Sequence, residues 1–511
     1  MESSRTLASL KNVAAAWLGQ LVSLICTFVV RMIFARYLEQ DYLGMETLFS
    51  NVLTMLSLAE LGIGSAIVFS LYKPLAEGDE RTIKSIMRLF RRCYVSIGCV
   101  IGIAGLILAP NITIFIKEGT DIPYLNIYFL FFVFNTAISY FFSYKGLLLT
   151  ADQKNYIVSL IRYGCQIALC AVQIVVLVLT GNYFLFLTCM LCATLTQNII
   201  TVIQANKRYP FLKEKDIEPI DKEILAGIKK NICGMVVHKL SSVVNAPVNT
   251  MVVSTILGLG PVAIYGNYLL VVNSLSRLVD QMFDSVVASI GNLSVTASKE
   301  RQYEVFQTTH FVNAFLYGPL CACFLALVTP FIHMTFGENY LFPLSVAVFF
   351  AVLFFFRGMR DAALSFVSAN GLFWQTRIKA IIEVIVLILT VPVATYFFGI
   401  EGMLAANIFV QIFISMLMEG IIVHKYALDA RSPVAYFVKT AQYTLATLVI
   451  CVPCFLAVQL LPDVALLRFL VGGVLCVMMS FGGFALFFHR SREFNEAKGI
   501  IMSFIRSRLK K

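Results

Sequence analysis

The strongest constraint in this sequence is a type of segment that recurs fourteen times, a run of mainly apolar residues long enough to cross a bilayer. A helix needs about 20 such residues to span the hydrocarbon core. The runs lie at about 12–36, 43–70, 93–116, 125–149, 157–180, 183–204, 232–257, 262–290, 308–332, 343–366, 374–397, 401–423, 434–458 and 465–488. None alternates with a period of two residues, so they are not strands of a membrane barrel. We therefore predict an all-α polytopic membrane protein with about 14 transmembrane helices.

The composition agrees with this prediction and excludes several other classes of protein. Of 511 residues, 59% are hydrophobic and only 14% are charged. Soluble domains carry roughly 25% charged residues, so this chain has too few to cover a soluble surface of its size. A soluble enzyme, a disordered chain and a secreted disulfide scaffold are therefore excluded.

The basic residues are distributed by membrane side. With the N-terminus in the cytoplasm, 32 of the 40 Lys and Arg residues fall in inner segments, Lys379 among them. The outer segments hold only Arg36, Lys117 and Arg468. This asymmetry follows the positive-inside rule and predicts that both termini are cytoplasmic. The net charge of +11 therefore reflects topology, and we expect no nucleic-acid partner.

A weak internal repeat divides the chain. Setting Gly44 on Gly266, an offset of 222 residues, also aligns Asn51 with Asn273. Parallel repeats of this kind are a transporter architecture, with the substrate bound where the repeats meet. We predict an N-terminal lobe of six spans at 1–210, a cytoplasmic linker at 211–230, a second six-span lobe at 231–425, and two extra helices with a basic tail at 426–511.

Polar residues inside the spans are the best functional signal, because each intramembrane charge costs about 2.5–3.5 kcal/mol on insertion scales. They concentrate in the first, second, seventh and eighth runs, which the repeat relates to one another. The candidates are Arg31, Glu60, Lys239, Asn245, Asn249, Asn273, Arg277, Asp280 and Asp284. Spacings of three, four and seven place Arg277, Asp280 and Asp284 on one helix face. Two interpretations remain open: the residues line a hydrated cavity, or they form ion pairs that lock the bundle.

A second charged group occupies the tenth and eleventh runs. Arg357, Arg360 and Asp361 lie in the tenth, and Glu383 lies in the eleventh. We expect a structural network of ion pairs there. Glu419, near the inner end of its run, is expected to have no special role.

Several chemical motifs are absent or lack a context. No G-x-x-x-x-G-K-[ST] sequence occurs, so no nucleotide is expected to bind by that route. The C-x-x-C pairs at 189–192 and 451–454 lie in apolar helices without a second ligand pair. We predict no metal and no cofactor.

Specific stretches of the N-terminal part resemble a known family. They are residues 31–38 (RMIFARYL), 42–44 (YLG), 58–67 (LAELGIGSAI) and 70–76 (SLYKPLA), with a second-lobe counterpart from Ala263 to Gly291. These sequence stretches resemble the bacterial oligosaccharide flippases of the polysaccharide-transport family (the Wzx type). That family belongs to the multidrug/oligosaccharidyl-lipid/polysaccharide exporter superfamily.

The resemblance implies two lobes around a central cavity and alternating access, in a transporter and not an enzyme. The substrate would be a polyprenyl-diphosphate-linked oligosaccharide, moved from the inner to the outer leaflet of the bacterial plasma membrane for surface polysaccharide synthesis. A polysaccharide polymerase and other assembly proteins would be partners. Arg31, Lys239 and Arg277 would bind the diphosphate through charge-assisted bonds. Asn245, Asn249, Asn273 and Asp280 would meet the sugars, and Glu60 and Asp284 are candidates for ion coupling.

Three alternatives remain. Fourteen spans leave open the related flippases of lipid-linked peptidoglycan precursors. A multidrug antiporter of the same superfamily would need an acidic, aromatic cavity, and Arg31, Lys239 and Arg277 argue against one. A membrane polymerase or acyltransferase would need a sizeable outer loop bearing Arg, His or Asp, which this sequence does not have.

Overall fold

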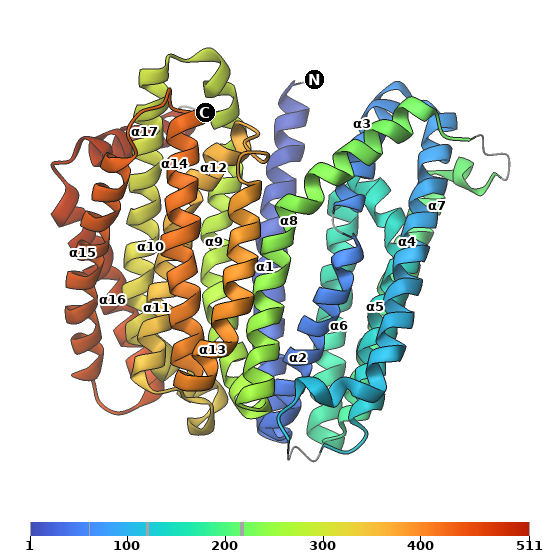
Figure 1. Ribbon diagram of the computed structural model, residues 1–511, viewed down its shortest axis with the longest axis horizontal. Helices are drawn as coiled ribbons and strands as arrows, with labels where there is room; N and C mark the ends of the chain where they lie inside the picture. Colours follow the sequence, from blue (N-terminus) through green and yellow to red (C-terminus); the bar gives the residue numbers. More distant parts are fainter. Residues whose placement is uncertain (1, 61, 119–121, 215–218, 510–511) are drawn as a thin grey trace. The chain divides into compact units, whose positions relative to one another are not determined.

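The computed structural model is built from helices throughout the part of the chain that it describes, which confirms the all-α class (Figure 1). The backbone is described for residues 2–60, 62–118, 122–214 and 219–509. Within those ranges the side chains are described except at 2–18, 59, 213, 222–223, 230–231, 233–243, 284–286, 288, 295, 500–501 and 503–509. No strand occurs in these described ranges.

The chain divides by internal contacts into two compact units, Met1–Ala263 and Ile264–Lys511. The predicted lobe boundaries at 210 and 231 come from the sequence repeat and stay a prediction. The helix α9 (Leu259–Thr296) begins in the first unit and continues in the second.

The first unit packs its helices in pairs. Its elements are α1 (Glu2–Tyr37), α2 (Gln40–Leu56), η1 (Ser57–Glu60), α3 (Ile63–Glu77), α4 (Glu80–Leu108), η2 (Ala109–Phe115), α5 (Leu125–Ala151), α6 (Asn155–Thr180), α7 (Tyr183–Arg208), η3 (Pro210–Lys213) and α8 (Lys222–Ile256). The main pairs are α1 with α6, α4 with α5, and α5 with α7. The helix α8 packs against α2 and α3, and it therefore groups with the N-terminal helices.

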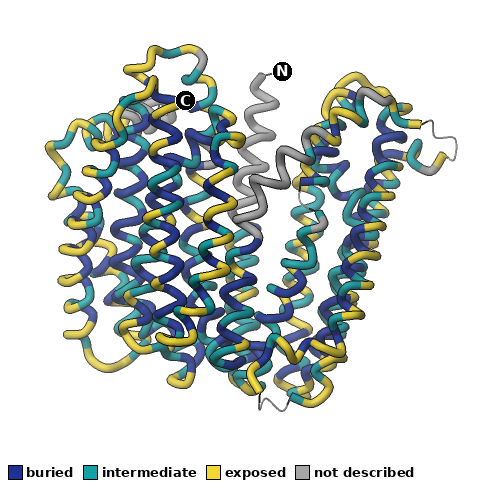
Figure 2. The backbone as a smooth tube through the Cα atoms, in the orientation of Figure 1, coloured by how far each residue is buried: buried dark blue, intermediate teal, exposed yellow. Residues whose placement is uncertain are grey.

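The second unit is arranged around a long central helix. Its elements after α9 are α10 (Lys299–Phe336), η4 (Glu338–Tyr340), α11 (Leu344–Met359), α12 (Asp361–Ala369), α13 (Arg377–Phe409), the π-helical segment η5 (Val410–Met416), α14 (Leu417–Tyr426), α15 (Val434–Gln459), α16 (Ala465–Phe488) and α17 (Arg492–Leu509). The helix α10 contacts α11, α15 and α16. In its most apolar stretch of 18 residues, 67% of the residues are buried. Figure 2 shows the outer helices of this unit alternating buried and exposed residues, as expected for helices with one face toward lipid.

Ten segments of the described residues are long and apolar enough to cross a membrane. Nine of them each match one predicted span. The tenth, Arg377–Tyr426, contains two predicted spans, because α13 turns at Gly399, which has a positive φ of 61°. Directly after this turn, a Cβ on Gly402 would lie 2.0 Å from the carbonyl oxygen of Ala394, so the two arms pack very closely.

The three remaining predicted spans are 43–70, 232–257 and 343–366. The first is divided between α2 and α3, and the third between α11 and α12, so neither contains one long helix. The second lies within α8, where many side chains fall outside the described set. Two of the predicted spans are therefore broken helices, a feature that apolarity alone does not predict.

The basic tail forms α17, which packs against α10. Arg492 bonds to Glu304, and Lys439 of α15 bonds to Glu493. Burial alone would raise the pKa of Glu493, but the bond from Lys439 outweighs it and holds that pKa below its usual range. The first residues of the tail are therefore anchored to the rest of the second unit.

Candidate functional site

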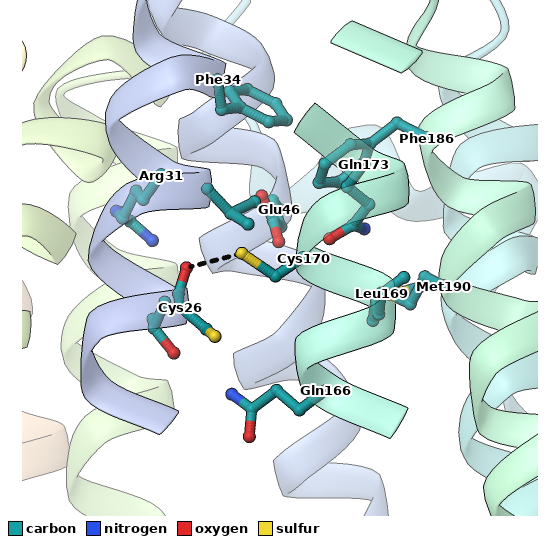
Figure 3. A pocket seen from close by; sticks show the side chains of 12 residues that line it. Cys26, Arg31, Phe34, Glu46, Gln166, Leu169, Cys170, Gln173, Phe186 and Met190 are labelled. Carbon is teal, nitrogen blue, oxygen red and sulfur yellow. Dashed lines mark hydrogen bonds between the residues drawn. The ribbon is translucent and has the colours of Figure 1, made fainter. Parts of the chain in front are cut away.

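The first unit contains a cavity of about 220 Å³ between α1, α2, α6 and α7, with a mainly apolar lining that includes a few polar side chains. Figure 3 shows Arg31 and Glu46 on neighbouring helices, with Gln166 and Gln173 of α6 across the cavity. The cavity is smaller than the roughly 300–1,000 Å³ typical of sites for drug-sized ligands. It therefore has room for water or a small ion and not for an oligosaccharide.

Arg31 lies in this cavity and has partners there. Its Nη2 donates to Oγ1 of Thr47 at 3.2 Å, and its charge interacts with that of Glu46. Glu46 is a cavity residue that the sequence analysis missed. The signal was present, since Glu46 is a charged residue inside the apolar run 43–70.

Glu60 lies where the second predicted span breaks. Its two carboxylate oxygens accept bonds from Tyr94 of α4 and Tyr140 of α5, each at 2.6 Å. Gly62 follows with a φ of 79°, which allows the chain to turn between η1 and α3. Gly64 packs so closely that a Cβ there would lie 2.5 Å from the hydroxyl of Tyr94. The carboxylate thus fixes the broken helix to two neighbours, and its role in ion coupling stays a prediction.

The predicted residues of the seventh span are only partly described. Asn249 is buried, and its Nδ2 donates to Oδ1 of Asn245 at 3.0 Å. Both lie on α8, on either side of Pro247. Lys239 lies outside the residues whose side chains the structure describes.

The end of α8 and the start of α9 approach α2 very closely. A Cβ on Gly44 would lie 2.0 Å from the carbonyl oxygen of Leu259, so only glycine fits. Gln40 donates to the carbonyl of Gly260 at 3.1 Å, and the amide of Lys117 donates to the carbonyl of Ser254 at 3.1 Å. Because the predicted topology places these segments on the outer side, they form a closed outer contact within the first unit.

The predicted polar face of α9 is distributed over different neighbours. Asn273 accepts a bond from Arg357 of α11 at 3.1 Å, and Asp280 accepts one from Tyr317 of α10 at 3.2 Å. Arg277, between them in sequence, is exposed. Asp284 lies outside the residues whose side chains the structure describes. The face therefore combines two residues packed against the unit with one exposed cation.

The second unit contains a buried ion cluster. Arg360 forms a bidentate bond with Glu419 at 2.7 and 2.5 Å, and Lys379 contacts both Glu419 and Glu383 at 2.9 Å. All four residues are less than 9% exposed, and two positive charges meet two negative ones. This confirms that Arg360 and Glu383 belong to a network of ion pairs.

One expectation about this cluster was wrong. Glu419 is central to the network, because the chain buries it at 1% exposure opposite Arg360. Lys379, which the sequence analysis counted among the residues of the inner segments, is held in the protein interior by two carboxylates. Asp361 does not join this cluster by a direct bond and instead accepts one from Tyr317 at 2.7 Å.

The structure therefore brings some predicted residues together and separates others. Arg31 and Glu60 lie in different parts of the first unit, each with its own partners. Asn273 and Asp280 belong to the second unit. No group of three or more His, Cys, Asp or Glu residues suited to a metal ion occurs among the described residues.

No protein-family model matches the chain, and no curated protein sequence matches it. Solved structures do. One described as "Lipid II flippase MurJ, inward closed conformation" has a TM-score of 0.64 at 15% identity, over 94% of this chain and 99% of that chain. An inward-facing multidrug resistance MATE family transporter of the MOP superfamily has a TM-score of 0.61 at 13% identity, over 81% of this chain and 96% of that chain.

A MATE transporter of Vibrio cholerae, VcmN, has a TM-score of 0.51 at 13% identity, over 84% of this chain and all of that chain. Such low identities show a common fold and nothing finer about activity. The neighbours are transporters and flippases, and the chain is a multi-pass membrane protein that shares the fold of these MOP superfamily structures.

Proposed function

We propose that this protein is a flippase of the Wzx type. It moves a polyprenyl-diphosphate-linked oligosaccharide from the inner to the outer leaflet of a bacterial plasma membrane by alternating access. The lipid tail stays in the bilayer while the charged head group crosses through the protein. The products serve surface polysaccharide synthesis, with a polymerase as the next protein to act.

The observation that carries the proposal is the exposed side chain of Arg277 within an apolar span. Arg277 lies in the segment Leu259–Phe283, which is long and apolar enough to cross a membrane. An arginine that faces hydrocarbon there would be strongly unfavourable, so this face of α9 is hydrated or binds an anion. A guanidinium in such a place suits a diphosphate, to which it can donate two parallel bonds.

The size of the described cavity supports a division of roles. At about 220 Å³, the cavity beside Arg31 and Glu46 does not accommodate a head group of several sugars. The head group would instead pass along the exposed face of α9. Arg31 would then act inside the N-terminal unit, next to Glu46, and the direct diphosphate contact would fall mainly to Arg277.

One observation favours a second candidate, a flippase of lipid-linked peptidoglycan precursors. The MurJ structure covers 94% of this chain, whereas the inward-facing MATE structure covers 81%. The difference in coverage is about the combined size of the helices α15 and α16. The length of the chain therefore agrees better with the MurJ structure than with the MATE structure. A multidrug antiporter shares the fold but has no comparable observation in its favour.

The test is depletion of the protein in its host, with rescue by variants. We expect depletion to remove surface polysaccharide and to leave lipid-linked repeat units on the inner leaflet. Arg277→Ala should fail to restore the polysaccharide at normal protein levels, and Arg277→Lys should restore part of it. The matched control is Arg468→Ala, because Arg468 bonds to the exposed Asp463 in a loop.

Three results would contradict the proposal. Normal polysaccharide with Arg277→Ala would remove Arg277 from the substrate path. Arrested cell-wall synthesis with unchanged polysaccharide would instead identify the peptidoglycan precursor as substrate, and altered drug resistance alone would identify an antiporter.

A further inference from the structure

The second unit contains an apolar groove of about 460 Å³ along one side of α15, which we call the α15 groove. Its opposite wall is formed by α11, the π-helical segment η5 and α14. The lining residues are Phe356, Met416, Leu417, Phe437, Thr440, Ala441, Thr444, Leu445 and Leu448. Because Ala441, Leu445 and Leu448 are exposed, the groove is open along this edge of α15.

The groove exists because α14 and α15 touch closely at one end only. The helix α15 packs mainly against α10 and α16. Gly420 of α14 lies so near the rings of Tyr436 and Phe437 that a Cβ there would approach them to 2.9 and 3.0 Å. One turn before Gly420, Met416 and Leu417 face the groove instead. The two helices are therefore joined near their cytoplasmic ends and separated toward the membrane centre.

The described lining residues offer little to a polar ligand. The hydroxyl groups of Thr440 and Thr444 donate to the carbonyl groups of Tyr436 and Thr440, at 2.9 and 2.8 Å. The other lining residues are apolar. An apolar space of this kind does not hold water, and an unfilled one deprives its walls of van der Waals contacts. A hydrocarbon chain therefore suits the groove.

The groove extends over the depth of one leaflet. Residues 437–448 of α15 cover about 16 Å along the helix axis. This length is close to half of a hydrocarbon core of about 30 Å. In the predicted topology α15 begins on the cytoplasmic side, because Arg431 and Lys439 belong to the inner basic residues. The groove therefore lies at the level of the acyl chains of the inner leaflet.

A basic residue continues the wall of the groove toward the inner membrane surface. Leu417, Ile421 and Lys425 follow one another at spacings of four residues on α14, so they share a helix face. Lys425 is exposed, and its Nζ lies 5.3 Å from the ring centroid of Tyr426. Lysine and tyrosine at this level are typical of the membrane–water interface, where anionic head groups lie. Lys439 of α15 is instead bonded to Glu493.

Charge and position favour a phospholipid over the proposed transport substrate. The phosphodiester of a phospholipid carries one negative charge, which a single lysine can balance. The proposed contact for the diphosphate, Arg277, lies on α9, and none of the described lining residues of the groove belongs to α9. The groove is therefore a separate site from the one assigned to the head group of the substrate.

We propose that the α15 groove binds one acyl chain of an anionic phospholipid of the inner leaflet, with the phosphate bonded to Lys425. The chain fills the space that the side chains of α14, η5 and α15 leave open. The lipid thus attaches α15 to the rest of the second unit over the length where these helices do not touch. This binding does not depend on the proposed flippase function.

The first test is native mass spectrometry of the purified, delipidated full-length protein. It would be titrated with phosphatidylglycerol and with phosphatidylcholine of the same chains, and we expect one phosphatidylglycerol to bind most tightly. Lys425→Gln should weaken this binding about fivefold at low salt and leave phosphatidylcholine binding unchanged. Its control is Lys73→Gln, at an exposed lysine of the first unit.

A second variant fills the groove itself. Ala441→Phe places a ring in the space for the chain, so we expect weaker binding of both lipids. Its control is Val449→Phe, because Val449 is exposed on α15 and is not a lining residue. Unchanged affinity for both lipids in Ala441→Phe would overturn the proposal, and unchanged phosphatidylglycerol binding in Lys425→Gln would remove the phosphate contact.

A further measurement uses the wild-type protein and so does not depend on the folding of a variant. Phosphatidylglycerol with a photoreactive group in one acyl chain should label residues 437–448, and excess unlabelled phosphatidylglycerol should prevent this. Labelling that avoids the segment would overturn the proposal. Prevention by polyprenyl phosphate but not by phosphatidylglycerol would also overturn it and assign the groove to the tail of a transport substrate. None of these measurements involves transport, so their outcomes are independent of the test of the proposed function.

Discussion

Two sets of charged side chains within the spans of the second unit have different surroundings. Arg360, Lys379, Glu383 and Glu419 compensate one another inside the protein. Arg277 is exposed within an apolar helix. Compensated buried charges hold a structure in one arrangement, whereas an exposed intramembrane charge needs water or a ligand. The first group is therefore structural, and the second carries the functional argument.

Replacing Glu419 by Gln tests the structural group. The change leaves Arg360 and Lys379 with Glu383 as their remaining acid in the cluster, and breaking a buried ion pair typically costs about 3–5 kcal/mol. We expect the free energy of unfolding in detergent micelles to fall by that amount. Glu338→Gln is the control, because the side chain of Glu338 is 82% exposed. Equal stability of the two variants would show that the cluster contributes little.

The tyrosines around Glu60 allow a second test at this scale. Tyr94→Phe and Tyr140→Phe each remove one bond to a charged acceptor, worth about 1.5–3 kcal/mol. We expect both variants to lower the midpoint of thermal unfolding, and the double variant to lower it further. Tyr156→Phe, at an exposed position, should leave the midpoint unchanged. An unchanged midpoint in Tyr94→Phe would mean that Glu60 does not fix the broken helix.

At the residue scale, the sequence predicted which residues are unusual better than it predicted their partners. Arg31, Asn273 and Asp280 were found because polar residues stand out in apolar runs. Glu419 was misjudged because its position near the end of a run suggested exposure, and its partner Arg360 is 59 residues away in sequence. Tyr317 had no sequence signal, because tyrosine is common in membrane helices. Such pairings depend on tertiary packing.

At the scale of helices, breaks matter as much as spans. Two of the predicted spans each consist of two shorter helices, separated near Gly62 and at Arg360. Broken helices in a membrane persist only where other groups satisfy the freed backbone. The carbonyl of Gly358, next to the second break, accepts its bond from Asn313. Apolarity places the spans along the chain but does not locate these breaks, since glycine occurs in unbroken helices too.

The close approach of α2 to the start of α9 gives a prediction for an element. Gly44→Ala would place a methyl group 2.0 Å from the carbonyl oxygen of Leu259, so the two helices must separate. We would replace Gln40 by cysteine both in a protein that keeps Gly44 and in one that carries Gly44→Ala. We expect this cysteine to react faster with a membrane-impermeant maleimide in the protein with Gly44→Ala. Gly102→Ala is the control, because its nearest neighbour lies at 3.9 Å, an ordinary contact. Equal labelling of both variants would contradict a closed outer contact.

At the scale of the whole molecule, the sequence predicted the class and most of the spans. Hydrophobic length and the distribution of Lys and Arg are set by the bilayer, so they are readable without tertiary contacts. The grouping of α8 with the N-terminal helices was not readable, because it depends on the packing of α8 against α2 and α3. The substrate is also beyond the fold, since flippases and drug transporters share it.

The most direct test of the central claim is translocation by the purified protein in vesicles. Polyprenyl-diphosphate-linked oligosaccharide from the host would be placed in one leaflet, and its appearance in the other would be measured with an enzyme that modifies only exposed sugars. We predict transfer with the wild-type protein and with Arg468→Ala, partial transfer with Arg277→Lys, and none above protein-free vesicles with Arg277→Ala. Equal transfer by wild type and Arg277→Ala would contradict the account, as would no transfer by the wild-type protein.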